Sequence, residues 1–248
     1  MSDQPLDGAA ALVTGAGCAI GRATAHHLVR AGAAVALVSE RGDRLDEIVN
    51  DIMMSGGKAI AVAADITDPA LAYQAVEDTH ERLGRLDVLV NGAGLMGLDT
   101  ALHTPIEEWD RMISLNVSAL LHVTHAAVPY LIDAAATSPR QVADLVNVGS
   151  LAGRVARPAG SVYNLTASGL NGFTESLRQE LRPESVRVSV VAPGAVYETT
   201  PDPARRPAGS MADRLRPEDI ADAISYIVTR GRGVAVNELL IRAAGQTW

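Results

Sequence analysis

Short apolar runs alternate along the chain with longer segments in which apolar residues recur at helical spacing. The runs are continuously apolar, which is typical of strands buried on both faces of a parallel sheet. We expect strands at 9–14, 33–38, 59–63, 86–90, 142–148, 186–191 and 237–241, and helices at 20–31, 43–54, 69–83, 105–134, 161–181 and 217–229. This strict alternation predicts a Rossmann-type, doubly wound α/β fold, in which helices cover both faces of a parallel sheet of about seven strands.

Nothing in the pattern divides the chain. No Pro/Gly/Ser-rich linker, charge block or internal repeat interrupts the alternation of elements. We therefore predict a single domain over residues 1–248, large enough to bury most of its apolar surface. Ligands of such sheets bind beyond the carboxyl ends of the strands, and glycines and small polar residues gather at these ends in this chain.

Composition narrows the partners of the domain. The chain is 48% hydrophobic and 20% charged, with a formal net charge of -8. This acidity argues against nucleic acid and against an anionic membrane as partners, and no apolar run is long enough to span a bilayer. The single cysteine, Cys18, and an acidic start without an apolar run indicate the cytoplasm. We expect a small-molecule substrate and no metal site.

A glycine-rich loop follows the first predicted strand and reads Thr14-Gly15-Ala16-Gly17-Cys18-Ala19-Ile20-Gly21. Glycines allow a tight turn and a close approach of the backbone to a pyrophosphate, which then binds the N–H groups at a helix N-terminus. A plain turn between strand and helix explains the same residues without any ligand. The position after the first strand favours the phosphate-binding interpretation.

Further residues, in order along the chain, resemble the short-chain dehydrogenase/reductase family. The loop resembles the family's TGxxxGxG motif, and the likeness continues through the NNAG-like turn Asn91-Gly92-Ala93-Gly94 and through Asn116, Ser150, Tyr163 and Pro193-Gly194. The segments 150–194 and 237–242 look closest to the clavulanic acid dehydrogenase-like branch. The resemblance covers nearly the whole chain and implies an oxidoreductase that uses NAD or NADP to interconvert a secondary alcohol and a ketone.

The resemblance implies which residues meet the cofactor. They are Gly15, Gly17, Ile20, Gly21, Ser39, Arg41, Asp65, Ile66, Asn91, Ala93, Gly94, Pro193, Gly194 and Thr199. In the family, a small residue with a nearby arginine at the end of the second strand admits the 2′-phosphate of NADP. Ser39 and Arg41 slightly favour NADP over NAD, whereas Glu40 stands where a phosphate-binding arginine often does. Glu40 and Arg41 are equally well explained as solvated charges at a helix start.

The resemblance also assigns the chemistry of carbonyl reduction. Tyr163 corresponds to the family's proton donor, Ser150 to the hydroxyl that polarises the carbonyl, and Asn116 to a residue that holds a water relay. The family's lysine follows the tyrosine by four residues, one helical turn on, and this chain has Ala167 there. A tyrosine titrates near 10, so about one in a thousand is ionised at pH 7, a deficit of about 4 kcal/mol. Loss of the cation therefore favours reduction, which needs a neutral phenol, over oxidation.

No other lysine replaces the missing one, because Lys58 is the only lysine of the chain and is predicted at the start of the third strand, far from the site. Arg154 and Arg157 lie in the loop between Ser150 and Tyr163. They either turn toward the phenol or are solvated loop charges, and the second interpretation is the ordinary one for arginines in a loop.

Four departures from the family pattern fall on the cofactor side, at Ala19, Gly92, Ala167 and Glu198. They leave three functions open. The first is the NAD(P)-dependent oxidoreductase. The second is a non-redox lyase, isomerase or dehalogenase-like enzyme on the same scaffold, with weakened or lost cofactor binding and with the Ser/Tyr pair as acid and base. The third is a non-catalytic subunit, against which the intact Ser/Tyr pair argues.

The resemblance finally implies a homodimer or homotetramer, because the predicted helices at 105–134 and 161–181 match elements through which family members associate. The segment 197–216 occupies the family's lid position. Its Arg205 and Arg206 either meet an anionic substrate or are solvated.

Overall fold

The computed structural model describes residues 4–197 and 214–246 and contains a seven-stranded sheet in which all strand pairs are parallel. The strands are β1 (Ala10–Thr14), β2 (Ala34–Ser39), β3 (Lys58–Ala63), β4 (Val88–Asn91), β5 (Ala143–Val148), β6 (Val186–Pro193) and β7 (Glu238–Ile241). The helices are α1 (Ala19–Arg30), α2 (Gly42–Met54), α3 (Pro69–Leu83), α4 (Ile106–Ile113), α5 (Leu120–Thr137), α6 (Ser161–Leu181) and α7 (Pro217–Val228). Each predicted strand and helix is present, with ends shifted by a few residues.

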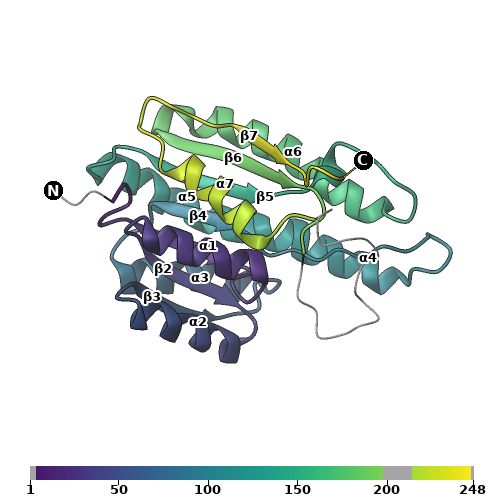
Figure 1. The fold of residues 1–248 in the computed structure, drawn as a ribbon, viewed down its shortest axis with the longest axis horizontal. Coiled ribbons are helices and arrows are strands. Elements are labelled where there is room, and N and C mark those ends of the chain that lie inside the picture. The colour runs from purple at the N-terminus through teal and green to yellow at the C-terminus, as the bar shows by residue number, and fades with distance from the viewer. Residues whose placement is uncertain (1–3, 198–213, 247–248) are drawn as a thin grey trace.

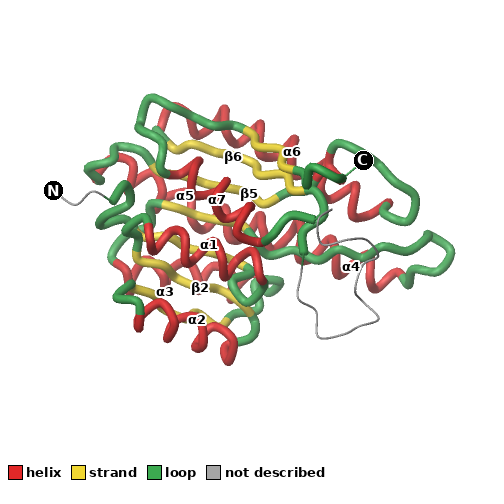
Figure 2. Tube along the Cα trace, in the orientation of Figure 1, coloured by secondary structure: helices red, strands yellow, loops and turns green. Residues whose placement is uncertain are grey.

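Helices cover both faces of the sheet, as Figures 1 and 2 show. On the face toward the viewer, α1, α2 and α7 pack on the strands through residues such as Leu28, Ile52 and Ile224, all fully buried. On the other face, α3, α5 and α6 form a second core that includes Val76 and Leu131. Both cores consist mainly of Ala, Val, Leu and Ile, and this arrangement confirms the predicted fold class.

The strand order is β3-β2-β1-β4-β5-β6-β7, so the direction of strand succession reverses beside β1. The carboxyl ends of β1 and β4 lie next to each other there, with Thr14 in register with Asn91. A crevice forms at such a reversal because the connections after the two strands leave toward opposite sides. The fold therefore places the glycine-rich loop and the Asn91–Gly94 turn on the same crevice.

The long helical region predicted at 105–134 is divided by a π-helix, Ser114–Ala119, that separates α4 from α5. Such widened turns are rare and often occur at functional sites, and this one contains Asn116. Within the described residues, the run Ile106–Thr137 is the one helix whose length and apolar composition would allow it to cross a membrane. Core helices of globular proteins share that composition, and α5 buries Val123, Ala127 and Leu131 in the second core.

Candidate active site

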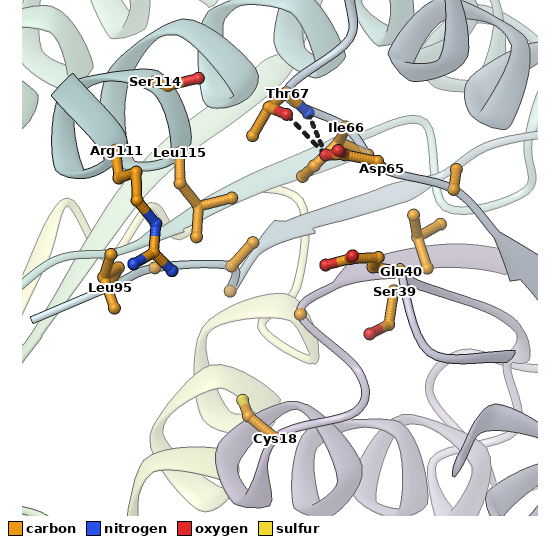
Figure 3. Close-up of a pocket in the computed structure, with 16 residues that line it drawn as sticks. Cys18, Ser39, Glu40, Asp65, Ile66, Thr67, Leu95, Arg111, Ser114 and Leu115 are labelled. Carbon is orange, nitrogen blue, oxygen red and sulfur yellow. Dashed lines mark hydrogen bonds between the residues drawn. The ribbon is translucent and has the colours of Figure 1, made fainter. Parts of the chain in front are cut away.

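A cavity of about 490 Å³ lies at the carboxyl ends of β1 to β4, in the crevice between the two halves of the sheet (Figure 3). Its wall is formed by Gly15 and Cys18 after β1, Val38–Glu40 at the end of β2, Ala64–Thr67 after β3, Gly92–Leu95 after β4, and Arg111, Ser114 and Leu115 from α4 and the π-helix. The cavity thus follows the edge of the sheet from β3 to β4.

The glycine-rich loop packs too tightly for side chains at two of its glycines. Gly15 has φ +67, and a Cβ there would lie 2.7 Å from the backbone of Ala93. A Cβ on Gly21 would strike the carbonyl oxygen of Gly15 and lie 2.7 Å from the Cα of Ala16. The first turn of α1 therefore sits directly on the loop, whose Gly15 and Cys18 line the cavity.

Other residues of the loop have different roles. Cys18 caps α1, because its Sγ accepts the N–H of Gly21 at 3.4 Å, and it also lines the cavity. Ala19, which departs from the family pattern, is the first residue of α1 and does not line the cavity. Gly17 faces Ser39, since a Cβ there would lie 2.9 Å from the Ser39 hydroxyl. Ile20 packs against the first core.

The ends of β1 and β4 are joined through a threonine hydroxyl. The Oγ1 atom of Thr14 accepts the backbone N–H groups of Gly92 and Ala93 at 3.1 and 3.3 Å. A Cβ on Gly92 would lie only 2.8 Å from the carbonyl oxygen of Thr14. Glycine at position 92, another departure from the family pattern, therefore allows the turn to approach β1 closely.

At the end of β2, Ser39 and Glu40 line the cavity and Arg41 does not. The guanidinium of Arg41 donates to Asp43 at 3.0 Å, and this hydrogen bond raises the pKa of the exposed arginine above its usual range. Figure 3 shows the Glu40 carboxylate extending into the cavity. The two charges expected at this position are thus separated: the carboxylate faces the cavity, and the guanidinium pairs with α2.

After β3, Asp65 and Ile66 both line the cavity, as the resemblance implied. Asp65 Oδ1 accepts the backbone N–H of Thr67 at 3.0 Å and its hydroxyl at 2.6 Å (Figure 3). The cap of α3 is Asp68, whose carboxylate accepts the N–H of Ala70 at 2.8 Å. Asp65 is therefore held at the cavity wall by its own turn, whereas Asp68 caps the helix.

Asn91 is buried behind the cavity wall. It is 2% exposed, and its amide donates to Thr124 on α5 and to Asn147 on β5, both at 2.9 Å. The Asn147 amide continues the chain to Thr174 on α6 at 2.9 Å. This buried network fixes the carboxyl ends of β4 and β5 relative to the helices behind them, so Asn91 positions the site and does not line the cavity.

Ser150 follows β5 and starts the short 3-10 turn Leu151–Gly153. Its Oγ accepts the N–H of Ala152 at 3.1 Å. The α6 side chain Asn164, next to Tyr163, donates to the carbonyl of Ala152 at 2.6 Å, so α6 holds the turn that starts at Ser150. Tyr163 lies in the first turn of α6 and is partly buried.

The turn after Ser150 rests on the position where the family has its lysine. Ala167 is 5% exposed, and a Cβ on Gly153 would lie 2.7 Å from the carbonyl oxygen of Ala167. Asn171 donates to the carbonyl of Gly153 at 3.2 Å. Polar residues of α6 thus bind the backbone of this turn on both sides of Ala167.

Asn116 connects the cavity wall to α6. Its side chain accepts the N–H of Leu95 at 2.7 Å and donates to the carbonyl of Leu95 at 2.8 Å. It also donates to Thr166 at 3.3 Å, and the Thr166 hydroxyl donates to the carbonyl of Tyr163 at 2.9 Å. The amide of Asn116 is therefore engaged in positioning the loop after β4 and the first turn of α6.

The end of β6 is fixed by the C-terminal segment. Gln246, 8% exposed, accepts the N–H of Ala195 and packs on Gly194, where a Cβ would lie 2.9 Å from the amide carbon. Pro193 and Gly194 do not line the cavity. Thr199 and Glu198, like Arg205 and Arg206, lie outside the described residues.

Arg154 does not turn toward the phenol. Its guanidinium pairs with Glu238 at the start of β7, with Nε 3.1 Å from Oε1, and this contact raises the arginine pKa. The pair connects the 150–194 and 237–242 segments, whose residues carried the closer family resemblance. Arg154 is therefore neither directed at the phenol nor simply solvated, because its exposed side chain is paired with Glu238.

Six of the residues expected at the cofactor line the cavity: Gly15, Ser39, Asp65, Ile66, Ala93 and Gly94. Eight further lining residues were not predicted from the sequence: Cys18, Val38, Ala64, Thr67, Leu95, Arg111, Ser114 and Leu115. The last three recur at spacings of three and four, which puts Arg111, Ser114 and Leu115 on one helix face. The sequence spacing therefore indicates that these three side chains share one helix face, but it does not indicate that this face lines the cavity.

Comparison with known proteins decides the family. The model of the short chain dehydrogenase family matches residues 9–207. The chain belongs to the short-chain dehydrogenase/reductase family. An uncharacterized oxidoreductase of Staphylococcus aureus strain N315 is 31% identical over 234 residues, which are 94% of this chain and 96% of that protein. The oxidoreductase family inferred from the motifs is thereby confirmed.

Solved structures of this family match the fold over nearly the whole chain. An alcohol dehydrogenase from the archaeon Thermococcus sibiricus, complexed with 5-hydroxy-NADP, matches with a TM-score of 0.86 at 26% sequence identity. The match covers 96% of this chain and 97% of that protein. A 3-ketoacyl-(acyl-carrier-protein) reductase from Brucella melitensis, complexed with NADH, has a TM-score of 0.84 at 30% identity and covers 96% and 98%. The Rossmann-type scaffold is therefore shared with dinucleotide-bound short-chain dehydrogenases/reductases.

Proposed function

We propose that this protein is an NAD(P)-dependent oxidoreductase that interconverts a secondary alcohol and a ketone and favours reduction. The observation that carries the proposal is the cavity across the ends of β1 to β4, combined with Ser150 and Tyr163. These two residues do not line that cavity, but they lie on adjoining segments, after β5 and in the first turn of α6. Family membership and the dinucleotides named for the solved relatives support it.

The residues present fit a nicotinamide dinucleotide. The tight contact of Gly15 and Gly21 presents the N-terminus of α1 to the cavity, where N–H groups and the helix dipole attract a pyrophosphate. Asp65 and Ile66 would hold the adenine end, and Ala93, Gly94 and Leu95 would line the path toward the substrate. The proposal includes both NADP and NAD. Ser39 is small enough to admit a 2′-phosphate, whereas the negative charge of Glu40 would repel that phosphate.

The chain's own contribution to carbonyl reduction starts with Ser150. A hydroxyl has one proton to donate and two lone pairs. Because Ser150 Oγ accepts the N–H of Ala152, its proton remains to donate to a carbonyl oxygen. This hydrogen bond polarises the carbonyl and stabilises the negative charge that develops on its oxygen.

When bound, a reduced nicotinamide supplies the hydride for the carbonyl carbon. Tyr163 then donates its phenolic proton to the same carbonyl oxygen, which leaves an alcohol. Reduction requires only the neutral phenol, which is the ordinary state at pH 7. Oxidation requires the phenolate, and Ala167 provides no cation to stabilise it, so the proposed enzyme works mainly as a reductase.

The test is turnover of a ketone panel with NADH and NADPH, followed by dinucleotide absorbance and product analysis. We expect Tyr163→Phe to lower kcat about a hundredfold or more, because a positioned proton donor contributes that much. Tyr226→Phe is the matched control, since Tyr226 is half exposed on α7 and its ring stacks with Arg230, away from the proposed site. Wild-type turnover by Tyr163→Phe, or no turnover of any ketone or alcohol by the wild type, would refute the proposal.

The proposal has four finer parts. The resemblance supports the placement in the clavulanic acid dehydrogenase-like branch and a homodimer or homotetramer. Family membership supports a small-molecule substrate, and the single cysteine supports a cytoplasmic location. The non-redox alternative gains no support, because in the described part of the chain the cofactor side is an open cavity and is not filled by side chains.

A further inference from the structure

Arg111 is a charged residue of the cavity that neither the motifs nor the catalytic constellation uses. It lies in the last turn of α4, and Figure 3 shows its guanidinium extending into the cavity, above the loop that carries Cys18. Among the described residues that line the cavity, it is the only cation, whereas Glu40 and Asp65 are carboxylates. A cation in this place alters which ligands the cavity attracts.

The local contacts of Arg111 leave most of its donors unused. Its Nη1 donates to Glu108, three residues earlier, at 2.9 Å, and the arginine side chain is 65% exposed. An exposed pair of this kind contributes little to stability. An arginine carries five N–H donors in a planar fork, and within the described residues one of them is engaged. The remaining donors face the cavity and match the oxygens of a phosphate.

Three other cations within the described residues lie or pair away from the cavity. Arg41 pairs with Asp43 and Arg154 with Glu238. Lys58 begins β3 at the opposite end of the sheet, about 20 Å from the cavity by strand length. Position 167, where the family supplies a lysine, is a buried alanine. Of the described residues that line the cavity, a doubly charged pyrophosphate would therefore meet one cation, Arg111, on the wall across from the N-terminus of α1.

We propose that Arg111 binds the pyrophosphate of the dinucleotide from the side opposite the α1 N-terminus. The inference rests on the proposed function and adds to it a binding residue outside the glycine-rich loop. In this arrangement the anion is held between backbone N–H groups on one wall and a guanidinium on the other.

The experiment measures dissociation constants by calorimetry for NADH, NADPH, ADP and adenosine, with the wild type, Arg111→Gln and Arg111→Lys. Arg111→Gln should weaken the dinucleotides and ADP about tenfold, the loss typical of a hydrogen bond to a charged group. Adenosine, which has no phosphate, should bind both proteins equally. The lysine variant should recover part of the affinity, and high salt should weaken the wild type more than Arg111→Gln.

Arg178→Gln is the control variant, because Arg178 also pairs with a glutamate three residues earlier, Glu175, but lies on α6 away from the cavity. It should bind all four ligands as the wild type does. Equal dinucleotide affinity in Arg111→Gln and the wild type would overturn the inference and leave the proposed function standing. A wild type that binds no dinucleotide would overturn both.

Discussion

Replacing Gly21 by alanine tests whether the glycine-rich loop is built around its contact with α1. In most helices this change stabilises, by about 1 kcal/mol, because alanine has the higher helix propensity. Here the added Cβ would strike the carbonyl of Gly15 and lie 2.7 Å from Ala16 Cα, where ordinary contacts begin at 3.4 Å. Both neighbours are backbone, so the loop or the helix must move. Overpacking of this kind costs about 1–3 kcal/mol, or more when backbone is involved.

The net expectation for Gly21→Ala is a loss of about 2 kcal/mol, which lowers Tm by roughly 4–8 °C in a domain of this size. Gly169→Ala is the control, because Gly169 is a helical glycine in α6 with nothing within 4 Å of an added Cβ. It should raise Tm by about 2–4 °C. Calorimetric unfolding of the three proteins gives both shifts.

The same displacement of the loop should reduce the affinity for NADH and NADPH by at least about tenfold, because the N–H groups at the start of α1 would no longer converge on the pyrophosphate. A Gly21→Ala protein with a raised Tm and unchanged dinucleotide affinity would refute this reasoning. It would mean that the loop adapts freely and that its tight packing has no part in the site.

Three further predictions concern the cavity. Glu40→Gln removes a carboxylate from the cavity wall and should strengthen NADPH binding relative to NADH binding by about 1 kcal/mol, roughly fivefold. An unchanged ratio of the two dissociation constants in a binding titration would contradict this. Ala167→Lys should raise alcohol oxidation more than tenfold at neutral pH and less at high pH, where phenols in general ionise without an added cation; initial rates that show a gain independent of pH would count against it. Bound NADH or NADPH should slow alkylation of Cys18, read by intact mass, and equal rates with and without dinucleotide would place the ligand elsewhere.

The strands and helices were predictable because burial on both faces gives a parallel strand a continuously apolar sequence, whereas a covering helix keeps its 3.6-residue period. The π-helix at Ser114–Ala119 was not predictable in this way. A single wider turn changes the direction of the side chains without changing the hydrophobic pattern that surrounds it.

The site was predictable where backbone geometry demands a residue type, as at Gly15 and Gly21. It was less predictable where a side chain has several partners within reach. The charge of Arg41 suggested a phosphate contact, yet Asp43, two residues on, binds its guanidinium. An asparagine at this position could line the cavity or lie in the protein interior. Asn91 is buried in the interior because Thr124 on α5 and Asn147 on β5 bind its amide.

The most direct test of the account is a calorimetric titration of the purified wild-type protein with NADH and with NADPH. The account predicts saturable binding of at least one of them at a single site per chain, with ADP competing for that site. No saturation at millimolar concentrations of either dinucleotide would contradict the claim that this cavity is a cofactor site. That result would favour the non-redox alternative, in which Ser150 and Tyr163 act as acid and base without a hydride donor.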